Sequence, residues 1–236
     1  MRSTLFRIAM VVGLAGLVGV GLEAQTIESL GLKEVPSSVP GGKTLALVIS
    51  GDGGWAAIDK DLARTLADSG ISVVGLNARA YLGTRRTPEA VAGDVEQVLR
   101  HYLTIWDRDR VILVGYSRGA NIAPFIVNRL PADLRARIDL VAMLGLGRHA
   151  GFHVSLFDLL HTTTSDKDPP VAPEIEALVA SNVRMMCIYG LDEPESYCRD
   201  APPGWIAKVI KRGAHHFDGD HAALALDILA QLNRRM

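Results

Sequence analysis

Short apolar runs alternate along this chain with longer segments in which apolar residues recur every three or four positions. Continuous apolar runs indicate buried strands, and the longer period indicates helices with one buried face. Strands are expected at residues 44–50, 71–76, 111–115, 138–144, 183–189 and 205–210, and the main helices at 58–69, 87–105, 120–129 and 220–234. This alternation predicts an α/β fold, with a mostly parallel sheet of about six or more strands and helices on both faces.

The N-terminus does not follow this alternation. Arg2 and Arg7 precede an apolar run of about 15 residues, which is shorter than the ~20 that a membrane span needs. A cleavage point after the small residue Ala24 follows the run. We therefore interpret residues 1–24 as a cleaved signal peptide rather than a membrane anchor. This predicts export, to a bacterial periplasm.

Three further segments complete the expected organisation. Residues 25–43 are rich in Pro, Gly and Ser and form a leader with at most one short edge strand. Residues 44–236 then form a single domain. Within it, residues 146–173 are an irregular insertion that could cap a site or form a long surface loop.

Composition and cysteine content narrow the function classes. The chain is 48% hydrophobic and 22% charged with a net charge of −1, so nothing indicates nucleic-acid binding or disorder. Its two cysteines, Cys187 and Cys198, have no zinc-ligand spacing around them. In an exported protein they are expected to form a disulfide; the alternative is a buried Cys187 with Cys198 unpaired. No metal or other cofactor is expected.

The sequence Gly-Tyr-Ser-Arg-Gly at residues 115–119 follows the most apolar strand directly. A Gly-x-Ser-x-Gly motif between a strand and a helix is typical of a nucleophile elbow, although the motif alone also arises by chance. Its position predicts Ser117 as a nucleophile, with the backbone amide of Arg118 directed at a developing oxyanion.

Parallel strands place their carboxyl ends at one sheet edge, where a base and an acid are expected after the later strands. The loop after the last strand contains His215 and His216; the spacing from the preceding glycine favours His216 as the base, with His215 as the alternative. The loop after residues 183–189 contains Asp192 and Glu193. Either one could orient the histidine.

Two more loops open at the same edge. The glycine-rich loop 50–55 could supply a second oxyanion amide, from Asp52 or Gly53; it lacks the Lys-Ser/Thr of a phosphate-binding P-loop. After the second strand, Tyr81, Arg85 and Arg86 could bind an anionic group such as a phosphate. The alternative is a solvated basic loop that pairs with nearby acidic residues.

Five motifs together resemble the bacterial virulence protein VirJ/AcvB family from about residue 44 to the C-terminus. They are Ser-Gly-Asp-Gly-Gly-Trp (50–55), Arg-Thr-Pro-Glu (86–89), Gly-Tyr-Ser-Arg-Gly-Ala (115–120), Cys-Ile-Tyr-Gly (187–190) and His-His-Phe-Asp-Gly-Asp (215–220). The resemblance implies an α/β-hydrolase fold in a periplasmic protein associated with type IV secretion and virulence. It also implies serine-hydrolase activity that removes the aminoacyl group from lysyl- or alanyl-phosphatidylglycerol.

The leading hypothesis is therefore a serine hydrolase whose partner is an aminoacylated anionic phospholipid at the membrane surface. The phospholipid supplies an acyl carbon for Ser117 and a phosphate for the arginines. One alternative is a non-catalytic periplasmic adaptor that contacts type IV secretion components; another is a general esterase for small esters. The ordered Ser, acid and His candidates favour an enzyme, because a scaffold has no chemical need for all three.

Overall fold

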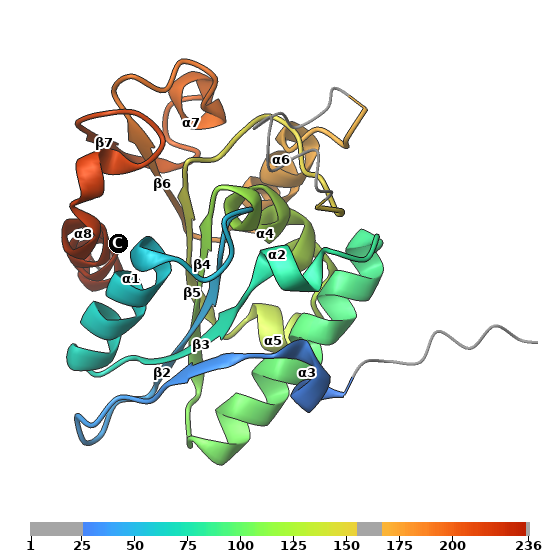
Figure 1. Cartoon of the computed structure of the whole chain (residues 1–236), viewed down its shortest axis with the longest axis vertical. Helices are drawn as coiled ribbons and strands as arrows, with labels where there is room; N and C mark the ends of the chain where they lie inside the picture. Colours follow the sequence, from blue (N-terminus) through green and yellow to red (C-terminus); the bar gives the residue numbers. More distant parts are fainter. Residues whose placement is uncertain (1–25, 155–166, 235–236) are drawn as a thin grey trace, which may run out of the picture.

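The computed structural model describes residues 26–154 and 167–234. Within these residues, seven strands form one sheet in the order β1-β3-β2-β4-β5-β6-β7 (Figure 1). The strands are β1 (Lys33–Val35), β2 (Thr44–Ile49), β3 (Ser72–Leu76), β4 (Arg110–Tyr116), β5 (Ile138–Leu144), β6 (Met185–Gly190) and β7 (Ala207–Lys211). All neighbouring strands are parallel except β1, which pairs antiparallel with β3 from within the leader.

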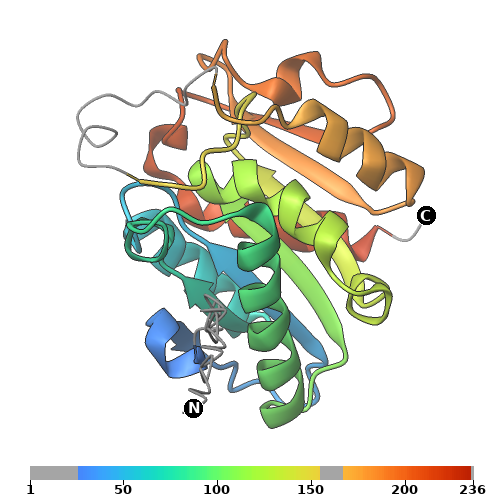
Figure 2. The ribbon, with the colours of Figure 1, turned by 90° about the vertical axis from the view of Figure 1, so that its right-hand side faces the viewer.

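Helices cover both faces of the sheet. Figure 1 shows α1 and α8 on one side, and Figure 2 shows α3, α4 and α6 across the other. The bounds of these helices are α1 (Ala57–Asp68), α3 (Pro88–Ile105), α4 (Arg118–Arg129), α6 (Ala172–Ala180) and α8 (His221–Asn233). Shorter helices are α2 (Ala78–Tyr81), α5 (Ala132–Arg135) and α7 (Tyr197–Asp200), with 3₁₀ turns at Ile27–Leu30 and Phe217–Gly219.

The central strand β4 explains why the predicted runs were apolar throughout. Val111 and Leu113 belong to the core beneath α3 and α4, whereas Ile112 and Val114 belong to the core beneath α1 and α8. Side chains on both sides of the strand are fully buried. The predicted fold, an α/β arrangement with a mostly parallel sheet and helices on both faces, is confirmed.

Part of the irregular insertion packs back onto the domain. The amide of Val154 donates to the carbonyl of Leu82, and the amide of Arg86 donates to the carbonyl of Phe152. Phe152 also meets Phe125 of α4 edge to face, with ring centroids 5.4 Å apart. This end of the insertion therefore covers α2 and α4. The middle of the insertion and the predicted signal peptide lie outside the described residues.

No helix in the described ranges is both long and apolar enough to cross a membrane.

Candidate active site

Ser117 lies in the sharp turn between β4 and α4, with φ 53° and ψ −114°. A side chain at positive φ is strained, so the surrounding packing must hold this conformation. The motif glycines permit that packing. A Cβ on Gly119 would collide with the backbone carbonyl of Ile49, and a Cβ on Gly115 would collide with the backbone of Gly119. The strand-to-helix turn predicted around Ser117 is thus the geometry present in the structure.

His215 and Glu193 form a directly bonded pair beside this turn. Nδ1 of His215 lies 2.5 Å from Oε1 of Glu193, and the other carboxylate oxygen accepts the amide of Gly190 at 3.1 Å. The His215 ring packs against Gly145, where a Cβ would meet it closely. The ring also stacks on Tyr116, with centroids 5.4 Å apart. These contacts fix the imidazole in orientation.

The neighbouring candidates have different surroundings. His216, which the sequence favoured as the base, directs Nδ1 to the hydroxyl oxygen of Tyr116 at 2.8 Å. The backbone amide of Asp192 donates to the carbonyl of Gly213, and Asp192 is exposed. Of the two histidines and two acids left open by the sequence, the structure brings His215 and Glu193 together.

The glycine-rich loop after β2 approaches Ser117 closely. Gly51 packs so near that a Cβ there would lie 3.0 Å from the Cβ of Ser117. The loop is also held by an ion pair: Arg118 donates from Nε and Nη2 to the two carboxylate oxygens of Asp52, at 2.7 and 3.0 Å. Their backbone amides are among the predicted oxyanion donors, with that of Gly53 as the alternative to Asp52. The paired side chains fix the two backbone segments relative to each other, a role that the sequence analysis missed.

A cavity of about 600 Å³ opens at this edge of the sheet. Its lining comprises Gly51, Asp52, Gly53, Gly54, Ala56, Ala57, Ile58, Tyr116, Ser117, Arg118, Asn121, Gly145, Gly147, Glu193, Glu195, His215, His216 and His221. Ser117, both histidines, Glu193 and the candidate oxyanion residues therefore share one cavity. The volume of this cavity and the apolar surface of its glycine and alanine residues suit a small organic group.

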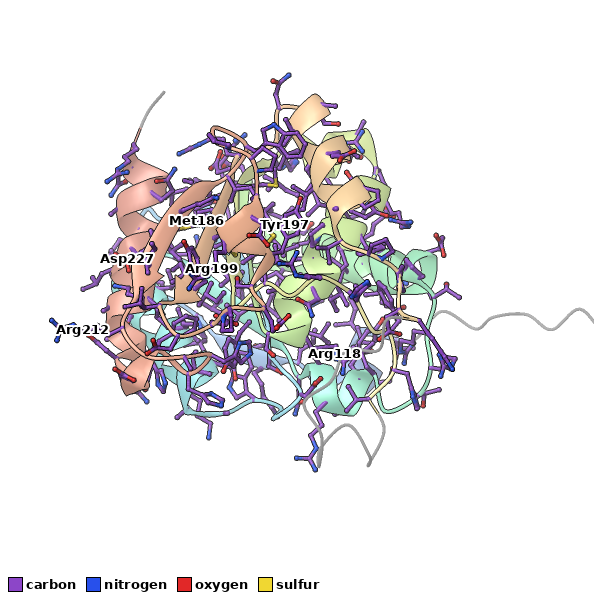
Figure 3. The ribbon with its side chains drawn as sticks, turned by 90° about the horizontal axis from the view of Figure 1, so that it is seen from above. Arg118, Met186, Tyr197, Arg199, Arg212 and Asp227 are labelled. Atoms are coloured by element: carbon purple, nitrogen blue, oxygen red, sulfur yellow. A yellow bond between two sulfur atoms is a disulfide. The ribbon has the colours of Figure 1, made fainter. Side chains whose placement is uncertain are left out.

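The charges around this cavity are unevenly matched. Arg118 is the one permanent cation among its described lining residues, and Asp52 neutralises it. In Figure 3, which views the molecule from above, Arg118 lies within the molecule, whereas Arg212 of the β7 loop extends outward. The Glu195 carboxylate is exposed and has no partner in the part of the chain that the structure describes. The Glu195 carboxylate is therefore a negative charge in the cavity with neither a cation nor a histidine beside it among the described residues, and no sequence motif signalled it.

The three residues predicted to bind an anionic group lie elsewhere. Tyr81 is buried and donates its hydroxyl to Asp94 at 2.6 Å. Arg86 lies over the Tyr81 ring, 4.1 Å from its centroid, and forms an ion pair with Asp94 at 3.3 Å. Arg85 is exposed. None of the three is among the residues described as lining the cavity, and Arg86 and Tyr81 are engaged in holding α2 to α3.

Replacement of Arg86 by alanine is expected to destabilise the fold. The Arg86 and Asp94 side chains are 14% and 10% exposed, so the variant leaves a largely buried carboxylate without its cation. Such a loss costs about 3 kcal/mol, or roughly 6–12 °C in Tm for a domain of this size. Thermal unfolding followed by circular dichroism measures it.

Arg85→Ala is the matched control, because it removes the same charge from an adjacent exposed position. Its Tm should stay within about 2 °C of the wild type. Equal Tm values for the two variants would show that the Arg86 ion pair does not support the fold.

Cys187 and Cys198 are joined by a disulfide, with Cα atoms 5.9 Å apart. The bridge connects β6 to α7 and encloses the loop that holds Glu193 and Glu195. Within the described residues, no group of three or more His, Cys, Asp or Glu side chains is placed to hold a metal ion.

Comparison with known families identifies the chain. The model of the family described as "Bacterial virulence protein (VirJ)" matches residues 43–236. The chain belongs to the VirJ family. This match covers the whole sheet from β2 onward together with every residue of the cavity, so the resemblance seen in the sequence motifs is confirmed. A search of curated protein sequences found no match to this VirJ-family chain.

The structure of this VirJ-family chain is similar to several solved structures. An alpha-beta serine hydrolase homologue from Coxiella burnetii has a TM-score of 0.60 at 16% identity, covering 85% of this chain and 90% of its own. MenH from S. aureus has a TM-score of 0.59 at 11% identity, with coverages of 85% and 97%. Est1E from Butyrivibrio proteoclasticus has a TM-score of 0.57 at 12% identity, with coverages of 86% and 93%. At these identities the likeness establishes the α/β-hydrolase fold.

Proposed function

We propose that this chain is a periplasmic serine hydrolase that cleaves the aminoacyl ester of lysyl- or alanyl-phosphatidylglycerol. The observation that carries the proposal is the strained Ser117 in the same cavity as the His215–Glu193 pair. Membership of the VirJ family and the α/β-hydrolase fold support hydrolysis in general. The substrate and the compartment are the parts that need separate support.

The proposed reaction assigns one task to each group. His215 accepts the hydroxyl proton of Ser117 as Oγ attacks the acyl carbon, and Glu193 stabilises the imidazolium that forms. The tetrahedral oxyanion accepts hydrogen bonds from the amide of Arg118 and from an amide of Asp52 or Gly53. His215 then returns the proton to the leaving alcohol. Water, activated by His215, hydrolyses the acyl-enzyme and frees Ser117.

The charge of the cavity favours an aminoacyl group. An aminoacyl ester carries an ammonium close to its acyl carbon, and Glu195 offers a carboxylate without a competing partner in the described structure. Arg118 does not oppose this charge, because Asp52 holds its guanidinium. Lysyl and alanyl groups both supply the ammonium and fit a cavity of about 600 Å³.

Location in the periplasm is supported by the disulfide, since such bonds persist in oxidising compartments. It is also supported by the N-terminal sequence, with its basic residues and short apolar run. A substrate at the outer face of the inner membrane would then be within reach of the exported protein.

A non-catalytic adaptor for a secretion system explains the site less well. A scaffold gains nothing from the strained conformation at Ser117, which costs about 1–3 kcal/mol and occurs chiefly where mechanism requires it. A general esterase remains chemically similar to the proposed enzyme, and the two differ in whether the amino group is recognised.

Substitution of Glu195 by glutamine tests that recognition. The change should lower kcat/KM for alanyl-phosphatidylglycerol about fivefold, because the ammonium loses its counter-charge at an exposed site. It should leave kcat/KM for N-acetylalanyl-phosphatidylglycerol unchanged, since acetylation removes the positive charge. The assay measures the alanine or N-acetylalanine that is released from the lipid in mixed micelles.

Asp192→Asn is the matched control, with the same charge change in the same loop at a position outside the cavity lining. This variant should have the same kcat/KM as the wild type for both lipids. Equal losses on the charged and the acetylated lipid in the Glu195 variant would contradict amino-group recognition and would favour the general esterase.

A further inference from the structure

Tyr116 connects the nucleophile turn to the loop that carries the base. It is the last residue of β4, and the next residue is Ser117. Tyr116 is buried, and its side chain reaches the loop after β7, where it contacts His215 and His216. The proposed reaction uses neither this phenol nor the second imidazole. One tyrosine therefore links the strand that ends at the nucleophile to the segment that contains the base.

The Tyr116 hydroxyl makes two contacts in this loop. Its oxygen lies 3.3 Å from the carbonyl oxygen of His215 and 2.8 Å from Nδ1 of His216. A carbonyl oxygen can only accept, so the single hydroxyl proton is donated to His215. The contact with Nδ1 is then a hydrogen bond only if Nδ1 carries a proton and donates it to the phenol oxygen. The two contacts together thus require the Nδ1–H form of His216, and they form a chain of two hydrogen bonds.

The ionisation of Tyr116 and of His216 is compatible with this chain. Burial, followed by the negative charges of Asp59 and Glu193, raises the pKa of the Tyr116 phenol above its ordinary value. The phenol therefore keeps the proton that it donates to His215. Nδ1–H is present both in the imidazolium and in one neutral tautomer of histidine, so His216 makes its bond without a change of charge.

The ring of Tyr116 also contacts the His215 side chain. It stacks on the imidazole, with centroids 5.4 Å apart and ring planes 28° apart. Tyr116 thus constrains His215 at two points, the face of its imidazole and its main-chain carbonyl. A general base must lie within about 3 Å of the hydroxyl whose proton it accepts, and a displacement of about 1 Å can lower the rate a hundredfold. Contacts that hold His215 therefore bear directly on its reaction with Ser117.

Resting on the proposed function, we propose that Tyr116 and His216 are positioning residues that set the distance and orientation of His215 relative to Ser117. His216 acts through Tyr116, because its Nδ1–H holds the phenol oxygen at the main chain of His215. Tyr116 is covalently bonded to Ser117, so the base and the nucleophile are both placed with reference to the end of β4. The second histidine of the loop, which the sequence favoured as the base, thus has a role that requires no contact with substrate.

Tyr116→Phe keeps the ring and removes both hydrogen bonds of the hydroxyl. It should lower kcat about tenfold, equally for alanyl-phosphatidylglycerol and for alanine ethyl ester, because the loss acts through the base. KM for each ester should change less than about twofold, since no binding contact is removed. An unchanged kcat, or a loss confined to KM, would overturn the inference.

Tyr189→Phe is the matched control for this variant. Tyr189 is buried near the end of β6, does not belong to the described cavity lining, and its hydroxyl has no hydrogen-bond partner among the described residues. The control should keep kcat within about twofold of the wild type. Equal losses of kcat in Tyr116→Phe and Tyr189→Phe would overturn the inference, because they would indicate a general effect on the sheet.

The role of His216 is tested in two backgrounds. In the otherwise wild-type protein, His216→Phe should lower kcat about threefold, because the phenol loses the bond that holds it. In the Tyr116→Phe background the same substitution should have no further effect, since the hydroxyl through which His216 acts is already absent. Equal losses in the two backgrounds would show that His216 acts independently of Tyr116 and would overturn its assigned role.

His216→Asn is the conservative variant, because the asparagine amide can place an N–H donor where Nδ1 of the histidine lies. It should therefore recover most of the kcat that His216→Phe loses. The same loss in His216→Asn and in His216→Phe would overturn the role of Nδ1–H as a donor.

The hydrogen bonds are measured by NMR without any substrate. In the ¹⁵N-histidine-labelled protein, neutral His216 should be protonated at Nδ1, and Tyr116→Phe should remove this preference. The proton between Nδ1 of His215 and Glu193 should exchange with water faster in Tyr116→Phe than in the wild type. An unprotonated Nδ1 on neutral His216 in the wild-type protein would overturn the inference.

Ser117→Ala tests the proposed function separately, because this substitution leaves the side-chain contacts of Tyr116 in place. Loss of hydrolysis in Ser117→Ala together with full kcat in Tyr116→Phe would overturn the positioning role and leave the hydrolase assignment standing. Retained hydrolysis in Ser117→Ala would overturn the proposed function, whereas the NMR measurement would still decide whether the chain of hydrogen bonds exists.

Discussion

Ser117→Ala is expected to lower kcat for ester hydrolysis by at least three orders of magnitude. The variant removes the atom that would attack the acyl carbon, and the remaining oxyanion amides and binding contacts cannot form the covalent intermediate. Single-turnover assays with alanyl-phosphatidylglycerol measure the loss. The acyl-enzyme, visible by mass spectrometry after rapid quenching of the wild type, should be absent from the variant.

Ser117→Gly provides a control for the backbone conformation. Both variants lack the nucleophile, but glycine tolerates φ 53° without strain, whereas alanine does not. After the larger entropy of unfolded glycine is subtracted, Ser117→Gly should be about 0.5–1 kcal/mol more stable than Ser117→Ala. Near-wild-type turnover in either variant would contradict nucleophilic catalysis at this turn.

Glu193→Gln is expected to lower kcat about 10³–10⁴-fold, with little change in KM. The amide that replaces the carboxylate cannot stabilise an imidazolium, and its N–H can favour the wrong tautomer of His215. The 2.5 Å contact between Glu193 and Nδ1 of His215 is the basis for this expectation. Steady-state kinetics on the same lipid separate kcat from KM.

Asp192→Asn makes the identical chemical change one residue earlier. Because Asp192 contributes its backbone amide to Gly213 and its residue is exposed, this variant should remain within about twofold of the wild type. A large loss in Asp192→Asn together with activity in Glu193→Gln would assign the acid to the other carboxylate.

The strands could be predicted because burial on both faces of the sheet produces continuous apolar runs in the sequence. The main helices could be predicted because one buried face produces apolar residues every three or four positions. β4 was expected at 111–115 and spans Arg110–Tyr116; α8 was expected at 220–234 and spans His221–Asn233. Helix α6 was missed. It has nine residues, of which Ile175 and Leu178 are buried, so it is too short for a recognisable period.

Sequence patterns could not show which of two adjacent residues forms the hydrogen-bonded pair. His215 and His216 share one loop, and the choice of partner depends on how closely the β6 and β7 loops approach at Gly190 and Gly213. Arg86 shows the same limit. Its loop faces the expected edge, but Asp94 on the next helix holds the guanidinium, as in the alternative interpretation of a basic loop paired with nearby acids.

The disulfide between Cys187 and Cys198 determines at which stage the loop between them becomes ordered. That loop carries both Glu193, the partner of His215, and Glu195, the free carboxylate of the cavity. An unbridged loop would lose conformational freedom each time a substrate engaged the two carboxylates, which would weaken binding. With the bridge closed, the chain loses that freedom once, during oxidative folding. Each later catalytic cycle then begins with both carboxylates already in place.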